Sequence, residues 1–336
     1  MTQSYEQDAP FCIQVELTTG CNLQCDFCGI NGFQSKPNSG MQFMELSTAK
    51  RLARQIKDAQ WNSRIEFAMH GEPLANPAWR EIVAVFRTEL PRAHMLLTTN
   101  GGMLLKGDVT ANINSYFKAG GTVMAIDMYE SVNFGRKIRA QVEPLDLLCE
   151  KVYEYPADKA GNPHHRSKQT FLSFVQDISA ATNGTHANLQ NHAGSAGELD
   201  YSKTDKPCVK PFREMGVNSD GSVDVCCNDW LGELTIGNVN ETPIDGIWHS
   251  DVMYAMRRML MGRNRVFRPC LGCSDVGYRI GLLPDKKGKV TMEPMDDWDR
   301  DIIEEALEQG PSRKPIGKVK ARLKNVIPSI NFKGAE

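Results

Sequence analysis

The first half of the chain alternates between two patterns of hydrophobic and polar positions. Short, nearly continuous apolar runs are typical of buried strands, and apolar residues that recur every three or four positions are typical of helices. The runs that predict strands are residues 11–17, 64–69, 122–127 and 170–179, together with residues 94–101, which predict a strand and its exit loop. The segments that predict helices are residues 47–59, 78–90, 113–120 and 145–155. Strands that alternate with helices predict an α/β fold with a parallel sheet or barrel of βα units.

The second half follows a different pattern. The sequence MGVNSDGSVDVCC (residues 215–227) predicts a β-hairpin that turns at SDG. Residues 243–261 predict one helix, and residues 293–308 predict an acidic helix. We divide the chain at these changes into a core (1–180), a polar linker (181–206), a small cysteine-rich domain (207–280) and a C-terminal part (281–336).

The composition excludes several classes of protein. The 336 residues are 41% hydrophobic and 24% charged, which is ordinary for a globular protein. A net charge of -2 gives no global attraction to nucleic acid or to membranes. The first residues lack the pattern of a signal peptide, and no apolar stretch is long enough to span a bilayer. We therefore expect a cytoplasmic protein, in which the ten cysteines bind metal or stay buried thiols rather than form disulfides.

Three cysteines lie in the loop after the first predicted strand. Cys21, Cys25 and Cys28 are spaced C-x3-C-x2-C within the stretch TGCNLQCDFCGING. Three thiolates are one too few for a closed tetrahedral zinc site. They suit an iron–sulfur cube, whose irons prefer thiolate ligands, with one iron left open. The alternatives are zinc binding and a loop of unrelated thiols.

Polar motifs follow the next three predicted strands. HGEP (His70–Pro73) follows the second strand, TTNG (Thr98–Gly101) follows the third, and Asp127 ends the fourth in AIDMY. Active sites of βα folds lie at the carboxyl ends of the strands, so we expect these motifs to meet the cysteine loop. Each motif alone is also consistent with an ordinary turn, because Gly, Pro, Asn and Asp are common turn residues.

Taken together, the cysteine loop and HGEP resemble the radical S-adenosylmethionine (SAM) superfamily. The resemblance implies a partial (β/α)6 TIM-like barrel, in which Cys21, Cys25 and Cys28 each bind one iron of a [4Fe-4S] cluster and SAM chelates the fourth iron. His70 departs from the family, which has glycine at this position. The SAM-binding residues that the resemblance implies are Phe27 for the adenine, Gly71, Glu72 and Pro73 for the methionyl ammonium, Asn100, and Asp127 for the ribose hydroxyls.

A second set of cysteines lies within residues 207–280. Cys208 and Cys226 are spaced C-x12-G-x4-C, and Cys270 and Cys273 are spaced C-x2-C. This pattern resembles the auxiliary-cluster domain of the SPASM and Twitch branches of the superfamily. Four suitably placed cysteines imply the shorter, Twitch-like form, with one fully ligated [4Fe-4S] cluster held by these four residues.

The remaining cysteines have other expected roles. Cys227 is adjacent to Cys226 and should point the opposite way on a strand, although an exchange of the two as ligands stays open. Cys12 and Cys149 fall in strand and helix patterns, where a thiol most often acts as a small buried hydrophobe. A zinc knuckle is the alternative for the four-cysteine set.

The resemblance also implies an activity. A radical SAM enzyme takes an electron from a reducing partner of the flavodoxin or ferredoxin type, cleaves SAM to a 5'-deoxyadenosyl radical, and abstracts hydrogen from its substrate. The enzyme is an oxidoreductase if the auxiliary cluster accepts electrons, and an isomerase if the reaction is redox-neutral. Beyond the cluster ligands, the sequence indicates no catalytic side chain.

Our first choice of substrate is a nucleotide in DNA. A radical isomerase of phage DNA modification would move a glycyl substituent on a thymine side chain from nitrogen to carbon, in the host cytoplasm. Two basic segments could contact phosphates. They are the arginines of residues 257–268 and a C-terminal tail with Arg313, Lys314, Lys318, Lys320, Arg322, Lys324 and Lys333.

Other substrates, and one other class of protein, stay open. Peptide maturation is the commonest use of this pair of domains, but only twenty residues precede Cys21, too few for a leader-peptide-binding module. A dehydrogenase of a small carbohydrate or aminocyclitol is the other enzyme. A zinc-binding nucleic-acid module that uses the same seven cysteines is the non-enzymatic alternative.

Overall fold

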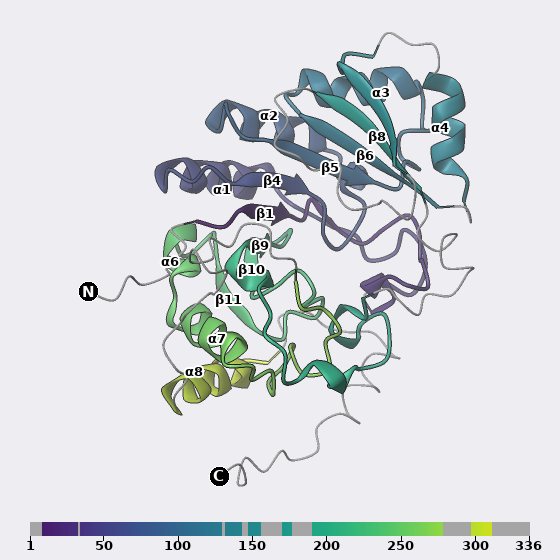
Figure 1. Ribbon diagram of the computed structural model, residues 1–336. Coiled ribbons are helices and arrows are strands. Elements are labelled where there is room, and N and C mark those ends of the chain that lie inside the picture. Colours follow the sequence, from purple (N-terminus) through teal and green to yellow (C-terminus); the bar gives the residue numbers. More distant parts are fainter. Residues whose placement is uncertain are drawn as a thin grey trace, which may run out of the picture.

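A nine-stranded sheet forms the centre of the computed structural model, which describes residues 9–32, 34–129, 132–142, 147–155, 170–176, 190–277 and 297–310. The strand order is β11-β10-β9-β1-β4-β5-β6-β8-β7 (Figure 1). The middle of the sheet is parallel throughout, as the alternating pattern predicts. Its strands are β1 (Cys12–Val15), β4 (Arg64–Phe67), β5 (Met95–Thr99), β6 (Val123–Met128) and β8 (Phe171–Gln176).

Four helices cover one face of these parallel strands (Figure 1). They are α1 (Leu46–Asp58), α2 (Trp79–Glu89), α3 (Val109–Lys118) and α4 (Phe134–Val142). In α1, Leu52 and Ile56 are fully buried, whereas Arg54 and Lys57 on the opposite face are exposed. The result is the partial TIM-like barrel that we expected, with the carboxyl ends of its strands along one edge.

The predicted hairpin exists and extends the core sheet. β9 (Glu214–Val217) pairs with β1 in parallel, and β10 (Ser222–Asp224) turns back beside it through Gly221, whose φ of +87° suits glycine. β11 (Thr235–Asn238) completes the sheet on this side. The cysteine-rich half of the chain is therefore joined to the core by main-chain hydrogen bonds.

Three helices pack beside this hairpin: α6 (Ile244–Trp248), α7 (Asp251–Met261) and α8 (Asp297–Glu308). The prediction of one helix over residues 243–261 is wrong in one respect. The chain breaks at Ser250, whose hydroxyl accepts a hydrogen bond from Met253 N and caps α7. The acidic α8 packs on α7, and the Arg258 guanidinium lies 3.1 Å from the Asp299 carboxylate.

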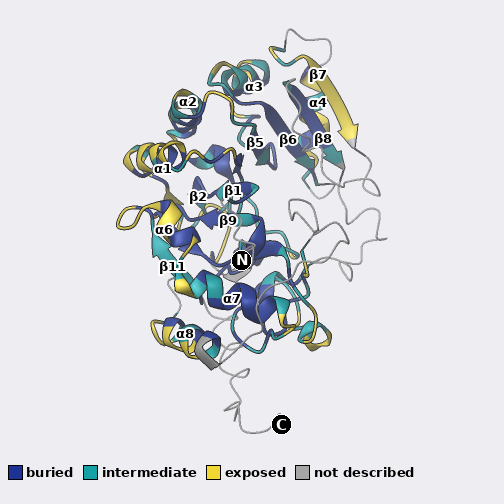
Figure 2. Cartoon of the chain, turned by 60° about the vertical axis from the view of Figure 1, so that its left-hand side comes forward, coloured by how far each residue is buried: buried dark blue, intermediate teal, exposed yellow. Residues whose placement is uncertain are grey.

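The predicted helix over residues 145–155 is also wrong, because its second half forms the strand β7 (Lys151–Tyr155). β7 pairs with β8 in parallel and lies at the end of the sheet. Val152 and Tyr153 are β-branched and aromatic, and both favour strands. β7 is an exposed edge strand (Figure 2), and Val152 is 52% exposed. Its residues therefore do not form the continuous apolar run of a buried strand, and we took their spacing for that of a helix.

Some predictions fall on residues that the structure does not describe. These are the end of the fifth strand (177–179), part of the linker (181–189), residues 281–296 and the basic tail (313–333). The described part of the linker forms two short 3-10 turns, His192–Gly194 and Tyr201–Lys203. Within the described residues, no helix has the length and apolar character needed to cross a membrane.

Candidate active site

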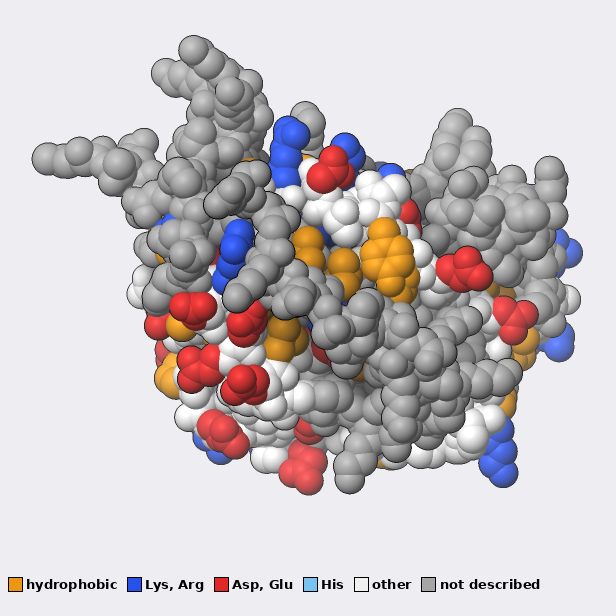
Figure 3. Space-filling view, turned by 90° about the horizontal axis from the view of Figure 1, so that it is seen from below, with side chains coloured by type: hydrophobic (Ala, Val, Ile, Leu, Met, Phe, Trp, Pro, Cys, Tyr) orange, Lys and Arg blue, Asp and Glu red, His pale blue; other side chains and the backbone are white. Residues whose placement is uncertain are grey.

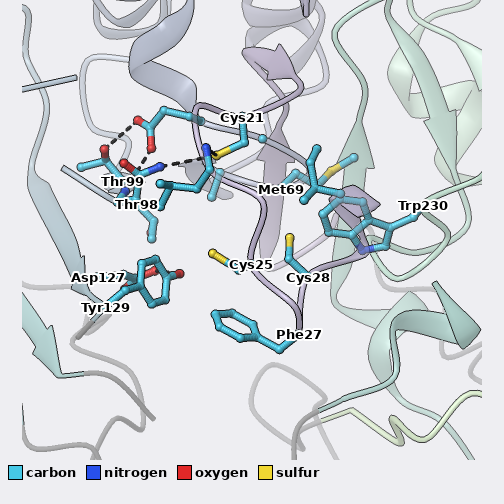
Figure 4. Close-up of a pocket in the computed structure, with 16 residues that line it drawn as sticks. Cys21, Cys25, Phe27, Cys28, Met69, Thr98, Thr99, Asp127, Tyr129 and Trp230 are labelled. Atoms are coloured by element: carbon cyan, nitrogen blue, oxygen red, sulfur yellow. Dashed lines mark hydrogen bonds between the residues drawn. The ribbon is translucent and has the colours of Figure 1, made fainter. Parts of the chain in front are cut away.

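One cavity lies where β1, β4, β5 and β6 end, and Figure 4 shows its wall. Pro73 does not line this cavity; it is buried at the start of a 3-10 turn (Pro73–Ala75). The other residues that the sequence assigned to the first cluster and to SAM all line it. They are Cys21, Cys25, Phe27, Cys28, Gly71, Glu72, Asn100 and Asp127.

A buried glutamine shapes the cysteine loop, which has little secondary structure of its own. Gln34 is 2% exposed, and its side-chain oxygen accepts a hydrogen bond from Cys21 N at 2.9 Å. Its side-chain nitrogen donates to Leu23 O at 2.7 Å. Further along, Cys28 N donates to Cys25 O at 3.0 Å. These bonds hold the three thiols around the cavity, as Figure 4 shows.

The loop thiols are costly to ionise without a cation nearby. Burial raises the pKa of Cys21 and that of Cys28 to about 12. Two N–H groups point at the Cys21 sulfur, from Leu23 N and Asn100 Nδ2, each at 3.4 Å. A metal centre would supply the positive charge that thiolates need, and the N–H groups would support the sulfur charge.

The HGEP motif is joined to the cysteine loop by main-chain contact. Gly20 and Gly71 form a parallel bridge, and Glu72 N donates to Gly20 O at 3.1 Å. A Cβ atom at Gly71 would lie less than 3.0 Å from the Thr18 carbonyl oxygen, a separation that real Cβ atoms essentially never show. Glycine at position 71 therefore allows the close approach of the two loops.

The Glu72 carboxylate ties the ends of β4 and β5 together. It accepts hydrogen bonds from Thr99 Oγ1 at 2.6 Å, Leu74 N at 3.1 Å and Asn100 N at 3.0 Å. Burial raises its pKa to about 7, although these three bonds favour the charged form. A carboxylate can accept about four hydrogen bonds, so one further donor can be accommodated.

On the far side of the cavity, Asp127 belongs to a small aromatic group. The Tyr129 hydroxyl donates to Asp127 Oδ2 at 3.4 Å, and the Tyr129 ring lies 5.6 Å from that of Phe27. Our sequence analysis did not select Tyr129, which lies two positions after Asp127 and directly after the end of β6 at Met128. Thr98 and Thr99, from the TTNG motif, also line the cavity, as expected. The analysis did not select the apolar residues of the wall, which are Leu23, Ile30, Ala68, Met69 and Trp230.

Cysteines of the second set lie close enough to affect one another's pKa. Burial raises the pKa of Cys208 to about 11. The pKa of Cys270 is raised by burial and then by the charges of Cys208 and Cys273. The pKa of Cys226 is raised chiefly by its hydrogen bond with Cys227 and by burial, and less by the charge of Cys208. Such effects require neighbouring sulfurs. Since Cys226 also hydrogen-bonds to Cys227, both are near the group and either can serve as the ligand.

Comparison with known families identifies two parts of the chain. Residues 15–131 match the radical SAM superfamily, and residues 208–274 match SPASM, an iron–sulfur cluster-binding domain. This chain is a radical SAM enzyme. Its family implies SAM and a [4Fe-4S] cluster as cofactors, and the SPASM domain implies auxiliary iron–sulfur binding.

One known enzyme and two solved structures resemble this radical SAM enzyme over most of its length. The S-adenosyl-L-methionine-dependent 2-deoxy-scyllo-inosamine dehydrogenase of Niallia circulans is 24% identical over 269 residues, which cover 80% of this chain and 94% of that protein. The crystal structure of BtrN in complex with AdoMet and 2-DOIA is 20% identical and covers 80% of this chain and 94% of that one, with a TM-score of 0.59. An open conformation of BtrN gives a TM-score of 0.53, at 20% identity and with coverage of 80% and 98%. The similarity of the structures supports the fold.

The residues of this radical SAM enzyme suit iron–sulfur clusters. Both groups of cysteines are free thiols, buried or partly buried, and the irons of such clusters prefer thiolate ligands. Within the described residues, no three His, Cys, Asp or Glu side chains come close enough to hold a single metal ion. Three cysteines lie outside the seven-residue ligand set, and Cys227 is the neighbour of Cys226. Cys12 is buried in β1, as predicted, whereas Cys149 lies outside a helix and is only partly buried, so the prediction of a buried helical thiol is wrong there.

The arginines of residues 257–268 do not form a phosphate-binding surface. Arg257 and Arg265 are buried and donate to main-chain carbonyls, Arg265 to those of Cys273 and Asp275. Arg258 pairs with Asp299, and Arg268 pairs with Glu233 at 2.8 Å; of the five arginines, only Arg263 is exposed. The hypothesis that this segment tracks phosphates is therefore wrong. The side chains instead satisfy carbonyls and carboxylates inside the auxiliary domain.

Proposed function

We propose that the cavity of Figure 4 binds SAM and the [4Fe-4S] cluster that SAM chelates, which we call the site cluster. Cys21, Cys25 and Cys28 would hold the cluster, and the Gly71–Pro73 segment would receive the methionyl ammonium, with Glu72 as its carboxylate. Asp127 would bind the ribose, Phe27 would pack near the adenine, and Asn100 would support both loops. The observation that carries this proposal is the convergence of three thiols and three strand ends on one cavity.

The bound cofactors supply a 5'-deoxyadenosyl radical that abstracts hydrogen from a substrate C–H bond. The chain positions the reacting groups and shields them from solvent. Ile30, Met69 and Trp230 give the wall an apolar side, which would exclude water from a reactive centre. The reducing partner that we propose is a flavodoxin or ferredoxin in the cytoplasm.

Gly71→Ala should weaken SAM binding strongly, because the added methyl group pushes the HGEP segment away from Thr18 and Gly20. We expect loss of SAM binding in equilibrium dialysis with reconstituted protein, and a stability loss of about 1–3 kcal/mol. Gly246→Ala is the matched control, since its Cβ would meet only Thr242 at 3.7 Å. Unchanged SAM affinity in Gly71→Ala would contradict the proposed ammonium site.

For the overall reaction we propose dehydrogenation of a small polyol or aminocyclitol. The support is the 2-deoxy-scyllo-inosamine dehydrogenase, of which 94% aligns with this chain. Oxidation of a carbinol removes a hydrogen atom from carbon, a proton from the hydroxyl group and one further electron. A fully ligated auxiliary cluster would supply an acceptor for that electron, and Cys208, Cys226, Cys270 and Cys273 would hold the cluster.

Substrate deuterium should distinguish an oxidation from an isomerisation. With an aminocyclitol deuterated at the carbinol carbon, we expect deuterium in 5'-deoxyadenosine and one equivalent of ketone for each SAM consumed. An isomerase would also move deuterium but would give a product of unchanged oxidation state. Mass spectrometry of both products under anaerobic conditions makes the measurement. If no polyol or aminocyclitol raises 5'-deoxyadenosine formation above background, the dehydrogenase proposal is wrong.

A modified thymine in DNA is the second candidate substrate, with a radical isomerase acting on its glycyl substituent. The observation that favours it is the basic tail, in which Lys318, Lys320, Arg322 and Lys324 lie close together in sequence. On the face that Figure 3 shows, Asp and Glu side chains lie beside the Lys and Arg side chains of the described residues.

Truncation before Ser312 should therefore weaken DNA binding and reduce its dependence on salt, because phosphate contacts release counterions. Both clusters and uncoupled SAM cleavage should be retained. Gel-shift titration of the full-length and truncated proteins at two salt concentrations makes the test. Equal and negligible binding by both would remove the DNA substrate.

A further inference from the structure

His70 occupies the position at which the family motif has glycine, and its side chain does not line the SAM cavity. It is 1% exposed and is held at both ring nitrogens. Nε2 lies 2.7 Å from the Cys227 carbonyl oxygen, which can only accept, so Nε2 donates this bond. Nδ1 lies 3.2 Å from Glu16 Oε1, at the end of β1. The ring therefore connects the core to the auxiliary cysteine loop.

Trp230 lies between this histidine and the first cysteine loop. Its ring is 4.4 Å from the His70 ring, and its indole lines the SAM cavity beside Met69 (Figure 4). A Cβ atom at Gly29, the residue after Cys28, would come within 3.0 Å of the indole. Trp230 itself follows Cys226 by four positions and is 4% exposed.

These contacts form a continuous series from one group of cysteines to the other. It runs from Cys28 and Gly29 to the Trp230 indole, across to the His70 ring, and through a hydrogen bond to Cys227, beside Cys226. Electron tunnelling falls off less steeply through bonds and packed π systems than through open space. The series has only two non-bonded steps, and both involve an aromatic ring.

We propose that Trp230 and His70 form the route by which an electron passes between the auxiliary cluster and the site cluster. The transfer is a balanced exchange in which the donor cluster is oxidised by one electron and the acceptor is reduced by one. In a dehydrogenase, this route would return the electron taken from the substrate to the site cluster. Only this return of the substrate electron rests on the proposed function. The transfer between the two clusters needs no substrate.

The test uses full-length protein with both clusters loaded and no substrate. A limiting amount of dithionite partly reduces the protein, and freeze-quench electron paramagnetic resonance follows how the electron redistributes. Added SAM perturbs the site-cluster signal and so identifies it. We expect Trp230→Leu to slow the redistribution several-fold, with iron content and both midpoint potentials unchanged. His70→Gln, which keeps a donor for the Cys227 carbonyl but removes the ring, should slow it as well.

Two further variants keep the test decisive. Trp248→Phe removes another fully buried indole that is not part of the series, and it should redistribute electrons at the wild-type rate. If Trp230→Leu does not retain its iron, Trp230→Phe takes its place. Wild-type rates in both the Trp230 and the His70 variants would overturn the route. A changed midpoint potential that accounts for the slower rate would also overturn it. Because no substrate is present, neither result depends on the reaction being a dehydrogenation.

Discussion

Replacing Cys21, Cys25 and Cys28 together with alanine will abolish 5'-deoxyadenosine formation and leave about half of the iron bound, since each [4Fe-4S] cluster would hold an equal share. All three thiols line the SAM cavity, and no other cysteine of the described residues does. The auxiliary cysteines lie on separate segments, and the loop substitutions do not touch them. Iron analysis and anaerobic chromatography of the nucleoside products make the measurement.

The triple substitution should change little else in the protein. The loop is held by Gln34, whose two hydrogen bonds go to main-chain atoms that alanine keeps. Cys12→Ala serves as the control, because it removes a buried thiol from β1 and should cost only about 1 kcal/mol. Its iron content and SAM cleavage should match those of the wild type. Continued production of 5'-deoxyadenosine by the triple variant would show that these cysteines do not hold the reactive cluster.

Sequence reasoning located most of the cavity, because parallel strands bring their carboxyl ends to one edge. The cysteine loop, HGEP and TTNG each follow a strand that the apolar pattern predicts, and Asp127 ends one, so their convergence follows from topology alone. The same rule could have found Tyr129, which directly follows the end of β6 in the AIDMY motif. Local periodicity and one rule of fold geometry carried this part of the prediction.

The rest depends on contacts that no local pattern encodes. Trp230 comes from the other half of the chain and reaches the SAM cavity only because β9 pairs with β1. The arginines at 257 and 265 look like surface charges in the sequence, yet burial and carbonyl partners make them structural. An exposed edge strand such as β7 has an apolar spacing that a short helix can share. These tertiary contacts account for the errors in our predictions.

Cys208→Ala and Cys273→Ala should each lose the auxiliary cluster and melt at a clearly lower temperature than the wild type. The four cysteines come from three segments: the approach to β9, the end of β10 and the turn after α7. Metal binding ties such segments together, so its free energy contributes to folding. Arg265, bonded to the carbonyls of Cys273 and Asp275, would lose the segment that it holds in place.

The matched control for these auxiliary variants is Cys149→Ala. Cys149 is partly buried near β7, far in sequence from either cysteine group, and its loss should leave iron content at the wild-type level. Cys226→Ala and Cys227→Ala, compared side by side, should show which of the two neighbouring thiols is the fourth ligand, because only one of them should lose the cluster. Iron and sulfide analysis with thermal melts under anaerobic conditions makes the comparison. If Cys149→Ala lost as much iron as Cys208→Ala, the ligand assignment would be wrong, and the partly buried thiol beside β7 would have to be part of a cluster site.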